Sequence, residues 1–128
     1  MTVKRGTETI LVIDDDAVIR DITASTLRAN GYTVLAARSG AEGLALLKEH
    51  DGDLHLLLTD VSMPGMSGGE VAEAVAAARP GTKTLFMSSY SAGAALHDSV
   101  REEGVAFLAK PFVHSILLRK VRAVLDAT

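Results

Sequence analysis

The residues of this chain that could do chemistry stand where short apolar runs end. Four such runs end in, or lead directly into, polar residues: Asp14, Asp15 and Asp16, then Asp60, Ser88 and Lys110. Carboxylates that are brought together repel one another and resist ionisation unless a cation lies among them. These residue types therefore indicate a site that combines several carboxylates with a cation.

A hard divalent ion suits such a cluster. Mg²⁺ suits it best, because it binds through one or two carboxylates, keeps several waters and accepts phosphate oxygens. The sequence has no cysteine and offers no base beside a nucleophilic serine. The covalent chemistry that it favours is therefore attack of a carboxylate on phosphorus, which gives an aspartyl phosphate. Lys110 would offset the charge on the phosphoryl oxygens, and the Ser88 hydroxyl would donate a hydrogen bond to one of them.

Each of these residues also has a purely structural interpretation. Asp14, Asp15 and Asp16 could cap the helix that follows them, and we expect Asp16 to do so. Taken alone, Ser88 would be a structural hydroxyl and Lys110 a solvated surface charge. Their shared position at the ends of apolar runs is what favours a functional site.

Strands and helices must position these residues. The hydrophobic pattern predicts that short strands and helices alternate five times along the chain. Strands are predicted over residues 9–13, 33–37, 54–59, 84–88 and 105–109. Helices are predicted over residues 17–30, 39–50, up to about residue 78, over 92–102, and from Pro111 onward. The first helix is expected to bury a stripe formed by Ile19, Ile22, Thr26 and Ala29, and to stop at Gly31.

Five β–α units predict an α/β fold, a doubly wound five-stranded parallel sheet with five helices on its two faces. In the flavodoxin-like strand order 2-1-3-4-5 the first and third strands are neighbours. Asp15 and Asp60 then converge at the carboxyl ends of the strands, where such sheets bind ligands. Residues 9–126 are expected to form one domain, preceded by a mobile tail of residues 1–8.

The composition argues against several other classes of site and partner. Lysine and arginine number 13 against 16 acidic residues, a net charge of −3, and they form no basic run. This balance does not favour nucleic acid or an anionic membrane as a partner. The lack of cysteine excludes a disulfide framework and a thiolate zinc site. Without a membrane-length apolar run or a signal-peptide pattern, the chain is expected to be a soluble cytoplasmic protein.

Four segments together resemble the receiver domain of response regulators. They are Ile-Asp-Asp-Asp (residues 13–16), Leu-Leu-Thr-Asp-Val-Ser-Met-Pro-Gly-Met-Ser-Gly (57–68), Met-Ser-Ser-Tyr (87–90) and Phe-Leu-Ala-Lys-Pro-Phe (107–112). The resemblance covers residues 9–125. The second and third segments look most like the receivers found at the C-termini of hybrid histidine kinases.

The resemblance implies a role for each matched residue at the metal site. Asp60 matches the phosphoacceptor and Asp15 the direct ligand of Mg²⁺, with Asp14 as its neighbour. Ser62 matches the position whose backbone carbonyl completes the metal shell. The phosphoryl donor would be the phosphohistidine of a histidine kinase or phosphotransfer domain. On this interpretation the protein is a signalling domain that catalyses only its own phosphorylation and dephosphorylation.

The resemblance also implies a conformational switch. Ser88 matches the switch hydroxyl, Phe107 the switch aromatic and Lys110 the phosphate-binding lysine, followed by a cis bond to Pro111. Tyr90 occupies a position that tunes phosphoryl lifetime, as does the residue two after the acceptor. Phosphorylation would alter the face formed by the fourth helix, fifth strand and fifth helix, which is also a possible dimer surface.

Two residues depart from the family pattern. Ser88 stands where threonine is usual, so its rotamer is less constrained. His55 stands where an aspartate is usual, and its place at the start of a strand indicates a structural role.

Two other functions fit part of the sequence. Asp14 and Asp16 match the nucleophile motif of haloacid-dehalogenase-type phosphatases, but the acidic pair that those enzymes need after the lysine is missing. A pseudoreceiver, which is an interaction module that is not phosphorylated, would lack the acceptor, the acidic pair or the lysine. The receiver interpretation is the one that uses Asp60, Lys110 and Ser88 together.

Overall fold

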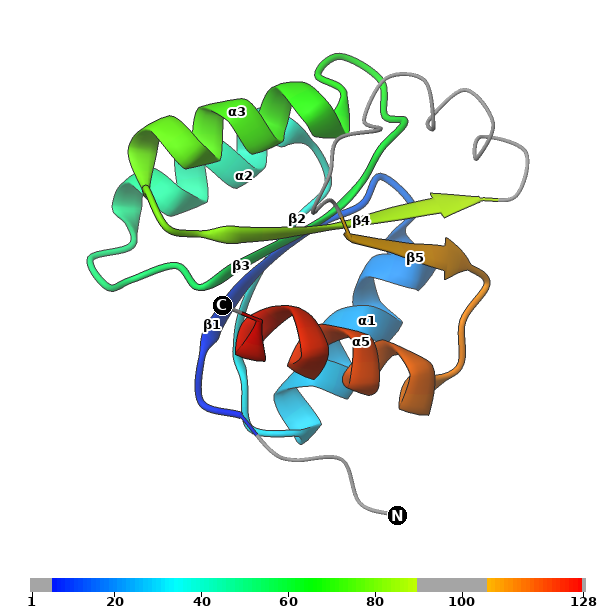
Figure 1. The fold of residues 1–128 in the computed structure, drawn as a ribbon. Coiled ribbons are helices and arrows are strands. Elements are labelled where there is room, and N and C mark those ends of the chain that lie inside the picture. Colours follow the sequence, from blue (N-terminus) through cyan, green and yellow to red (C-terminus); the bar gives the residue numbers. More distant parts are fainter. Residues whose placement is uncertain (1–5, 90–105, 128) are drawn as a thin grey trace.

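The structure is a computed structural model that describes residues 6–89 and 106–127 (Figure 1). Its centre is a five-stranded parallel sheet in the order β2-β1-β3-β4-β5. The strands are β1 (Thr9–Ile13), β2 (Thr33–Ala37), β3 (Leu56–Asp60), β4 (Lys83–Ser89) and β5 (Ala106–Lys110). The helices of the described residues are α1 (Ala17–Ala29), α2 (Gly40–Glu49), α3 (Gly68–Ala78) and α5 (His114–Asp126). The predicted flavodoxin-like sheet is confirmed, and the helix expected over residues 92–102 lies outside the described residues.

Helices cover both faces of the sheet, with α1 and α5 on one face and α2 and α3 on the other (Figure 1). Successive side chains of a strand point to opposite faces, so a strand covered on both sides must be apolar throughout. In β1, Ile10 and Val12 pack toward α1 and α5, whereas Leu11 and Ile13 pack toward α2 and α3. The continuous apolar runs of the sequence are therefore the core of the molecule.

Local signals in the sequence determine where the helices begin and end. Asp16 caps α1 by accepting hydrogen bonds from the backbone N–H groups of Val18 and Ile19. Ser39 caps α2 in the same way. After α1, Gly31 has a φ of 100°, a left-handed conformation that glycine adopts without strain. These predicted caps and the predicted stop are confirmed.

The face of α1 that packs on the sheet differs from the prediction. Thr23, Ala24 and Leu27 are buried, whereas Ile22 is 46% exposed and Val18 is 67% exposed. The small side chains of Thr23 and Ala24 allow the helix backbone to approach the sheet closely, and Leu27 fills the space beside them. Apolar spacing alone does not distinguish this face from the neighbouring one, and of the predicted stripe Ile19 and Thr26 are partly buried whereas Ile22 and Ala29 are exposed.

The start of the last helix also differs from the prediction. α5 begins at His114, three residues after Pro111, with Val113 as its N-cap. The predicted tail is described from Gly6 onward, and these residues contact the domain. The backbone N–H of Gly6 donates to the carbonyl of Asn30 at 3.1 Å.

An ionic cluster joins the first described residues to α5. Arg122 Nη2 donates to Glu8 Oε2 at 2.6 Å and to Asp126 Oδ1 at 2.8 Å, and Arg122 Nη1 donates to the Tyr32 hydroxyl at 3.3 Å. The pKa of Glu8 falls to about 2, mainly because of its hydrogen bond with Arg122. We call Glu8, Tyr32, Arg122 and Asp126 the terminal clasp.

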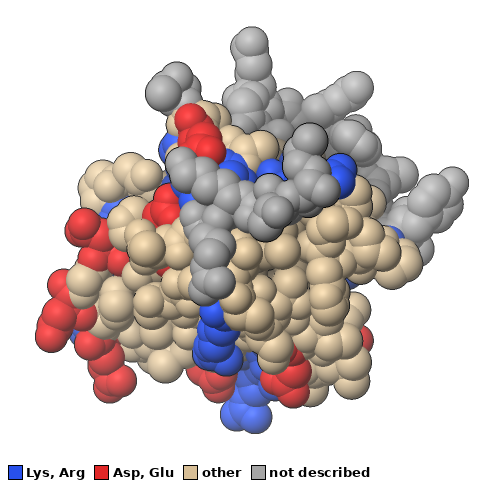
Figure 2. Space-filling model, turned by 90° about the horizontal axis from the view of Figure 1, so that it is seen from below, with Lys and Arg blue, Asp and Glu red and all other residues tan. Residues whose placement is uncertain are grey.

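The end of α5 has a second attachment to the sheet. Lys83, the first residue of β4, donates from Nζ to the carbonyls of Leu125, at 3.0 Å, and Ala127. A cation is favourable there because the last carbonyls of a helix carry partial negative charge. In the view from below, most of the visible described surface is uncharged, acidic side chains gather along the left edge, and basic and acidic side chains lie side by side at the bottom (Figure 2). In the described residues, no helix is both long enough and apolar enough to span a membrane.

Candidate functional site

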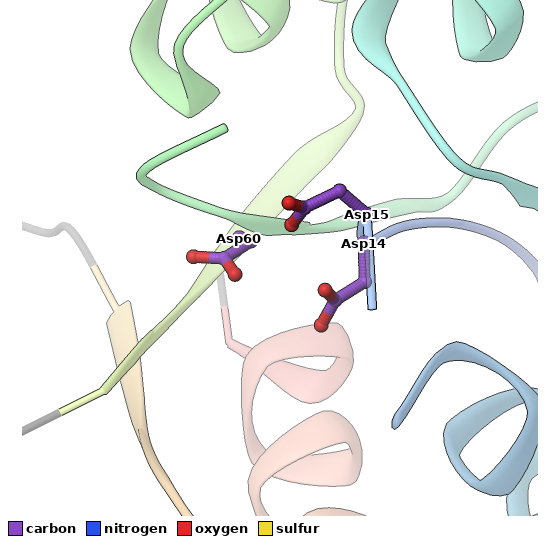
Figure 3. Close-up of side chains that lie close together, drawn as sticks. All are labelled: Asp14, Asp15 and Asp60. Carbon is purple, nitrogen blue, oxygen red and sulfur yellow. The ribbon is translucent and has the colours of Figure 1, made fainter. Parts of the chain in front are cut away.

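The predicted carboxylates lie at the carboxyl edge of the sheet, on two neighbouring strands. Asp14 directly follows β1 and Asp60 is the last residue of β3, the strand that pairs with β1. Ligand atoms of Asp14, Asp15 and Asp60 all lie within 4.8 Å of one another. Figure 3 shows the three side chains side by side at the ends of these strands. The predicted convergence of Asp15 and Asp60 is confirmed.

The three carboxylates differ in exposure. Asp14 is fully buried, Asp60 is half-buried and Asp15 is exposed. Burial is the largest influence on Asp14 and raises its pKa above 3.8, against the opposing effect of the Lys110 ammonium. An additional cation beside this cluster would favour the ionised form of Asp14.

Lys110 lies between two of the carboxylates. Its Nζ is 2.6 Å from Asp14 Oδ2 and 2.8 Å from Asp60 Oδ2, and its side chain is only 10% exposed. Burial opposes the charged ammonium, but the hydrogen bonds to Asp14 and Asp60 outweigh it and raise the pKa of Lys110. The peptide bond from Lys110 to Pro111 is cis, as predicted. The structural interpretation of Lys110 as a solvated surface charge is therefore excluded.

Asp14 has a hydrogen-bond partner on each of its polar groups. Its backbone N–H donates to the Ala37 carbonyl at 3.1 Å, and its Oδ1 accepts from the Asp16 N–H at 2.9 Å. Its Oδ2 accepts from Lys110, and its carbonyl accepts from Arg20 Nη1 at 3.0 Å. These contacts fix the direction of the buried carboxylate.

The loop after β3 holds Asp60 through backbone contacts. Asp60 Oδ1 accepts a hydrogen bond from the Ser62 N–H at 3.2 Å, and the Gly68 N–H donates to the Val61 carbonyl at 2.8 Å. A Cβ on Gly68 would lie 2.5 Å from the Asp60 carbonyl oxygen and 2.8 Å from Val61 Cα. Gly68 is therefore needed for close contact between the start of α3 and the end of β3.

The sequence does not reveal this role of Gly68, because it predicts only that the glycines after Asp60 form turns. Its neighbour Gly65 does adopt a turn conformation, with a φ of 83°. Gly68 instead begins a helix capped by Ser67. One feature of the sequence could have indicated the close contact made by Gly68. This residue stands at the start of a predicted helix, where glycine is not otherwise favoured.

The predicted switch residues are only partly described. Ser88 lies in β4 opposite Ala109 and is 9% exposed. The Phe107 ring lies 5.8 Å from the Phe86 ring, centroid to centroid, in a tilted arrangement. Tyr90 lies outside the described residues.

His55 lies at the opposite, amino edge of the sheet. Its Nδ1 accepts a hydrogen bond from the Thr9 N–H at 3.0 Å, and its backbone N–H donates to the Thr9 carbonyl at 3.0 Å. These bonds link the beginnings of β1 and β3. The structural role predicted for His55 is supported by this position.

The donor set fits a hard cation. Three carboxylates close together, one of them exposed, match the oxygen ligands and the open, water-accessible geometry that Mg²⁺ prefers. The described part of this cluster contains no sulfur or imidazole that would favour a softer metal. Asp14, Asp15 and Asp60 are the residues that could hold the ion.

Comparison with known proteins agrees with this geometry. Residues 10–122 match the response regulator receiver domain family. The sensor kinase CckA of Brucella abortus is 31% identical over 121 residues, which cover 94% of this chain and 13% of that protein. The response regulator MprA of Mycobacterium ulcerans is 32% identical over 126 residues, covering 93% of this chain and half of that protein. The chain thus spans half or less of these relatives.

A solved structure shows the same likeness. The receiver domain of the hybrid histidine kinase CckA is 32% identical, has a TM-score of 0.76, and aligns over 92% of this chain and 99% of that one. The predicted resemblance to receivers of hybrid kinases is confirmed. With its sheet order, its carboxylate cluster and its buried lysine, the chain belongs to the response regulator receiver domain family.

Proposed function

We propose that the protein is a phosphoacceptor in a two-component phosphorelay, and that Asp60 receives the phosphoryl group. The observation that carries this proposal is the position of Lys110, whose ammonium lies 2.8 Å from Asp60 within a cluster of three carboxylates. A buried cation at this point can offset charge on phosphoryl oxygens bonded to Asp60. The donor is the phosphohistidine of a histidine kinase or a phosphotransfer domain.

The transfer forms one bond and breaks one. An Asp60 carboxylate oxygen attacks the phosphorus in line, the bond from phosphorus to the imidazole nitrogen breaks, and that nitrogen keeps the electron pair. Asp14, Asp15, Asp60 and the Ser62 carbonyl would hold Mg²⁺, which would offset the negative charge on the phosphoryl oxygens. Lys110, whose ammonium lies beside Asp60, would donate a hydrogen bond to a phosphoryl oxygen, and water attack on the acyl phosphate later resets Asp60. The protein catalyses no reaction beyond these two.

Asp60 is a better nucleophile than Asp14 in this arrangement. Both carboxylate oxygens of each residue accept hydrogen bonds, so the two residues differ in exposure rather than in partners, and Asp14 is fully buried. Asp60 is only half-buried and closes its strand at the surface. This difference supports the receiver function over a phosphatase that uses Asp14.

Phosphorylation would change the conformation of the protein through the switch residues. The Ser88 hydroxyl moves to the new phosphoryl oxygens, and Phe107 takes the space that is vacated. Tyr90 and Ser62 tune the lifetime of the phosphoryl group. The altered face comprises the proposed fourth helix, β5 and α5, and it is also the proposed dimer surface. Similar NMR shifts on this face with and without beryllofluoride would contradict the switch.

The surroundings of the site suit a protein as the donor. Val18 and Ile22 are exposed on α1, and Val113 and Ile116 are exposed at the start of α5. Both helices begin at the carboxyl edge that carries Asp60. Exposed apolar side chains beside a reactive group indicate a docking surface.

We propose that the domain of residues 9–126 acts in the cytoplasm, with neither nucleic acid nor membrane as a partner.

The decisive experiment is labelling of the purified protein with acetyl phosphate in the presence and absence of Mg²⁺. We expect Mg²⁺-dependent addition of one phosphoryl group, located at Asp60 by mass spectrometry after borohydride reduction. Asp60→Asn should abolish it, and Asp14→Asn should only weaken it. Labelling that survives Asp60→Asn but not Asp14→Asn would identify Asp14 as the nucleophile. An unlabelled wild-type protein would indicate an interaction module.

A further inference from the structure

Arg20 contacts the acidic loop from the first turn of α1. Its Nη1 donates to the carbonyl of Asp14 at 3.0 Å. We propose that Arg20 is a positioning residue, which sets the direction of the metal-binding carboxylates without touching the metal or the phosphoryl group. This inference rests on the proposed function, because it concerns the same site.

The bond from Arg20 completes the set of contacts that fixes Asp14. The other three come from the Ala37 carbonyl, the Asp16 N–H and the Lys110 ammonium. These three groups belong to β2, to the loop after β1 and to β5, whereas Arg20 belongs to α1. With all four in place, neither the carboxylate nor the peptide unit of Asp14 can rotate without breaking a hydrogen bond inside the fold.

The carbonyl that Arg20 holds belongs to the peptide bond between Asp14 and Asp15. Asp15 is exposed, and within residues 6–89 and 106–127 no hydrogen bond to its carboxylate is found. Its direction therefore depends on the backbone that carries it. Arg20 fixes that backbone on the carbonyl side, which aims Asp15 at the ligand cluster before a metal arrives.

The place of Arg20 in the helix argues for a specific role. The N-terminus of a helix carries partial positive charge, so a cation in the first turn is unfavourable, and in α1 the acidic residue that offsets it is the N-cap Asp16 rather than a residue of the first turn itself. The bond to the Asp14 carbonyl and the nearby carboxylates compensate for this unfavourable position. A residue chosen only for helix stability would be acidic at this point.

The same helix contains a matched control. Arg28 Nη2 donates to the carbonyl of Val34 at 3.0 Å, which is the same type of bond at the same length. Arg28 lies in the last turn of α1, away from the carboxyl edge and in a position where a cation is favourable. Arg28→Gln removes one guanidinium bond and one positive charge, as Arg20→Gln does, but leaves the loop untouched.

The test is the Mg²⁺ affinity of the metal-free protein, measured by isothermal titration calorimetry. Removing a positive charge near a cation site should by itself strengthen Mg²⁺ binding. If Arg20 positions the ligands, Arg20→Gln should instead weaken Mg²⁺ binding by about tenfold, which is typical for the loss of a partner of a metal ligand. The direction of the change thus separates positioning from a simple charge effect.

Three comparisons complete the experiment. Arg28→Gln should leave the Mg²⁺ affinity unchanged within about twofold, and Arg20→Lys should restore part of the loss, because lysine keeps the charge and one donor. In labelling with acetyl phosphate, Arg20→Gln should raise the Mg²⁺ concentration needed for the half-maximal rate. The rate at saturating Mg²⁺ should change little.

The inference is overturned if Arg20→Gln binds Mg²⁺ as tightly as the wild type or more tightly. It is equally overturned if Arg28→Gln shows the same loss, because helix stability would then be the cause. Failure of the proposed function would be seen separately, as absence of phosphoryl labelling in the wild-type protein. The calorimetric comparison of the variants does not depend on that labelling.

Discussion

A buried carboxylate such as Asp14 lowers the stability of the metal-free fold when it ionises, yet metal binding requires the ionised form. Its pKa is raised above 3.8, chiefly by burial, so the folded protein holds this proton more tightly than the unfolded chain does. The free energy of unfolding therefore decreases as the pH rises from 3.8 through the raised pKa. The surroundings of Asp14 therefore reduce the stability of the metal-free fold, as the proposed metal-binding role would require.

Asp14→Asn should accordingly remove the fall in the free energy of unfolding that this carboxyl causes as the pH rises from 3.8. The amide has one acceptor oxygen where the carboxylate has two, so its NH₂ group must face Lys110 or the Asp16 N–H, and the variant should be less stable than the wild type at pH 3.8. It should also weaken Mg²⁺ binding about tenfold or more, because a neutral amide replaces a carboxylate of the proposed metal site. Thermal unfolding over a pH series, with EDTA and with excess Mg²⁺, measures both effects. A difference from the wild type that stays the same at every pH would contradict this account.

Gly68 provides a second prediction at the scale of one residue. Gly68→Ala places a Cβ 2.5 Å from the Asp60 carbonyl oxygen, so the backbone of the proposed acceptor must move. We expect a loss of roughly 1–3 kcal/mol in the free energy of unfolding. The rate of labelling by acetyl phosphate should fall about tenfold or more, because small displacements of a reacting group are costly.

Gly65→Ala is the control for this change. Gly65 has a φ of 83°, and a Cβ there would have no atom within 4 Å. Alanine should cost about 1 kcal/mol in strain, with little effect on labelling. Urea denaturation and labelling rates compare the two variants. Equal labelling by both would show that the contact of Gly68 with Asp60 does not position the acceptor.

At the scale of the elements, α1 has two apolar faces with different roles. Its inner face packs on the sheet through Thr23, Ala24 and Leu27, and its outer face exposes Val18 and Ile22. An exposed isoleucine contributes little to folding, and Ile22 belongs to the docking surface proposed above for the phosphoryl donor.

Ile22→Ser should change the free energy of unfolding by no more than about 0.5 kcal/mol. Phosphotransfer from a phosphorylated histidine phosphotransfer domain should slow by about tenfold, which is typical for loss of one important interface residue. Labelling by acetyl phosphate should be unaffected, because this small donor needs no docking. Ala77→Ser, an exposed change on α3 across the sheet, is the control. Equal slowing with both donors would instead indicate a disturbed site.

Some features of the elements could be predicted from the sequence alone, and others could not. The sheet order, the convergence of Asp15 with Asp60 and the cap at Asp16 follow from rules that act locally or on strand order. The buried face of α1 does not, because it depends on how closely small side chains let the helix approach the sheet. Neither does the contact of Gly68 with Asp60, which joins two elements across a loop. These are properties of tertiary packing, which periodicity does not encode.

At the scale of the whole molecule, the terminal clasp connects the first described residues with the last helix. The pKa of Glu8 is lowered from 4.5 to about 2, mainly by its hydrogen bond with Arg122. The clasp therefore stabilises the fold fully above pH 4.5, and this contribution is lost as the pH falls from 4.5 toward 2.

Glu8→Gln should lower the free energy of unfolding by about 1 kcal/mol at neutral pH, a value that allows for screening of a partly exposed pair. The difference from the wild type should disappear in acid. Glu42→Gln, which removes the more exposed pair of Glu42 with Arg38, should have a smaller effect at every pH. Urea denaturation over a pH series measures both variants. A difference that persists at pH 2 would assign the effect of Glu8 to packing rather than to charge.

The attachments of Lys83 to the end of α5, together with the clasp, bring both ends of the described chain to the amino edge of the sheet. Asp60 lies at the opposite edge. A surface, bead or fluorescent protein coupled through either end would therefore leave the carboxylates facing solution. The two ends are also natural points to join by a short peptide, so that the chain could be reopened elsewhere as a circular permutant. The fold thus allows the molecule to be immobilised without blocking its reactive side.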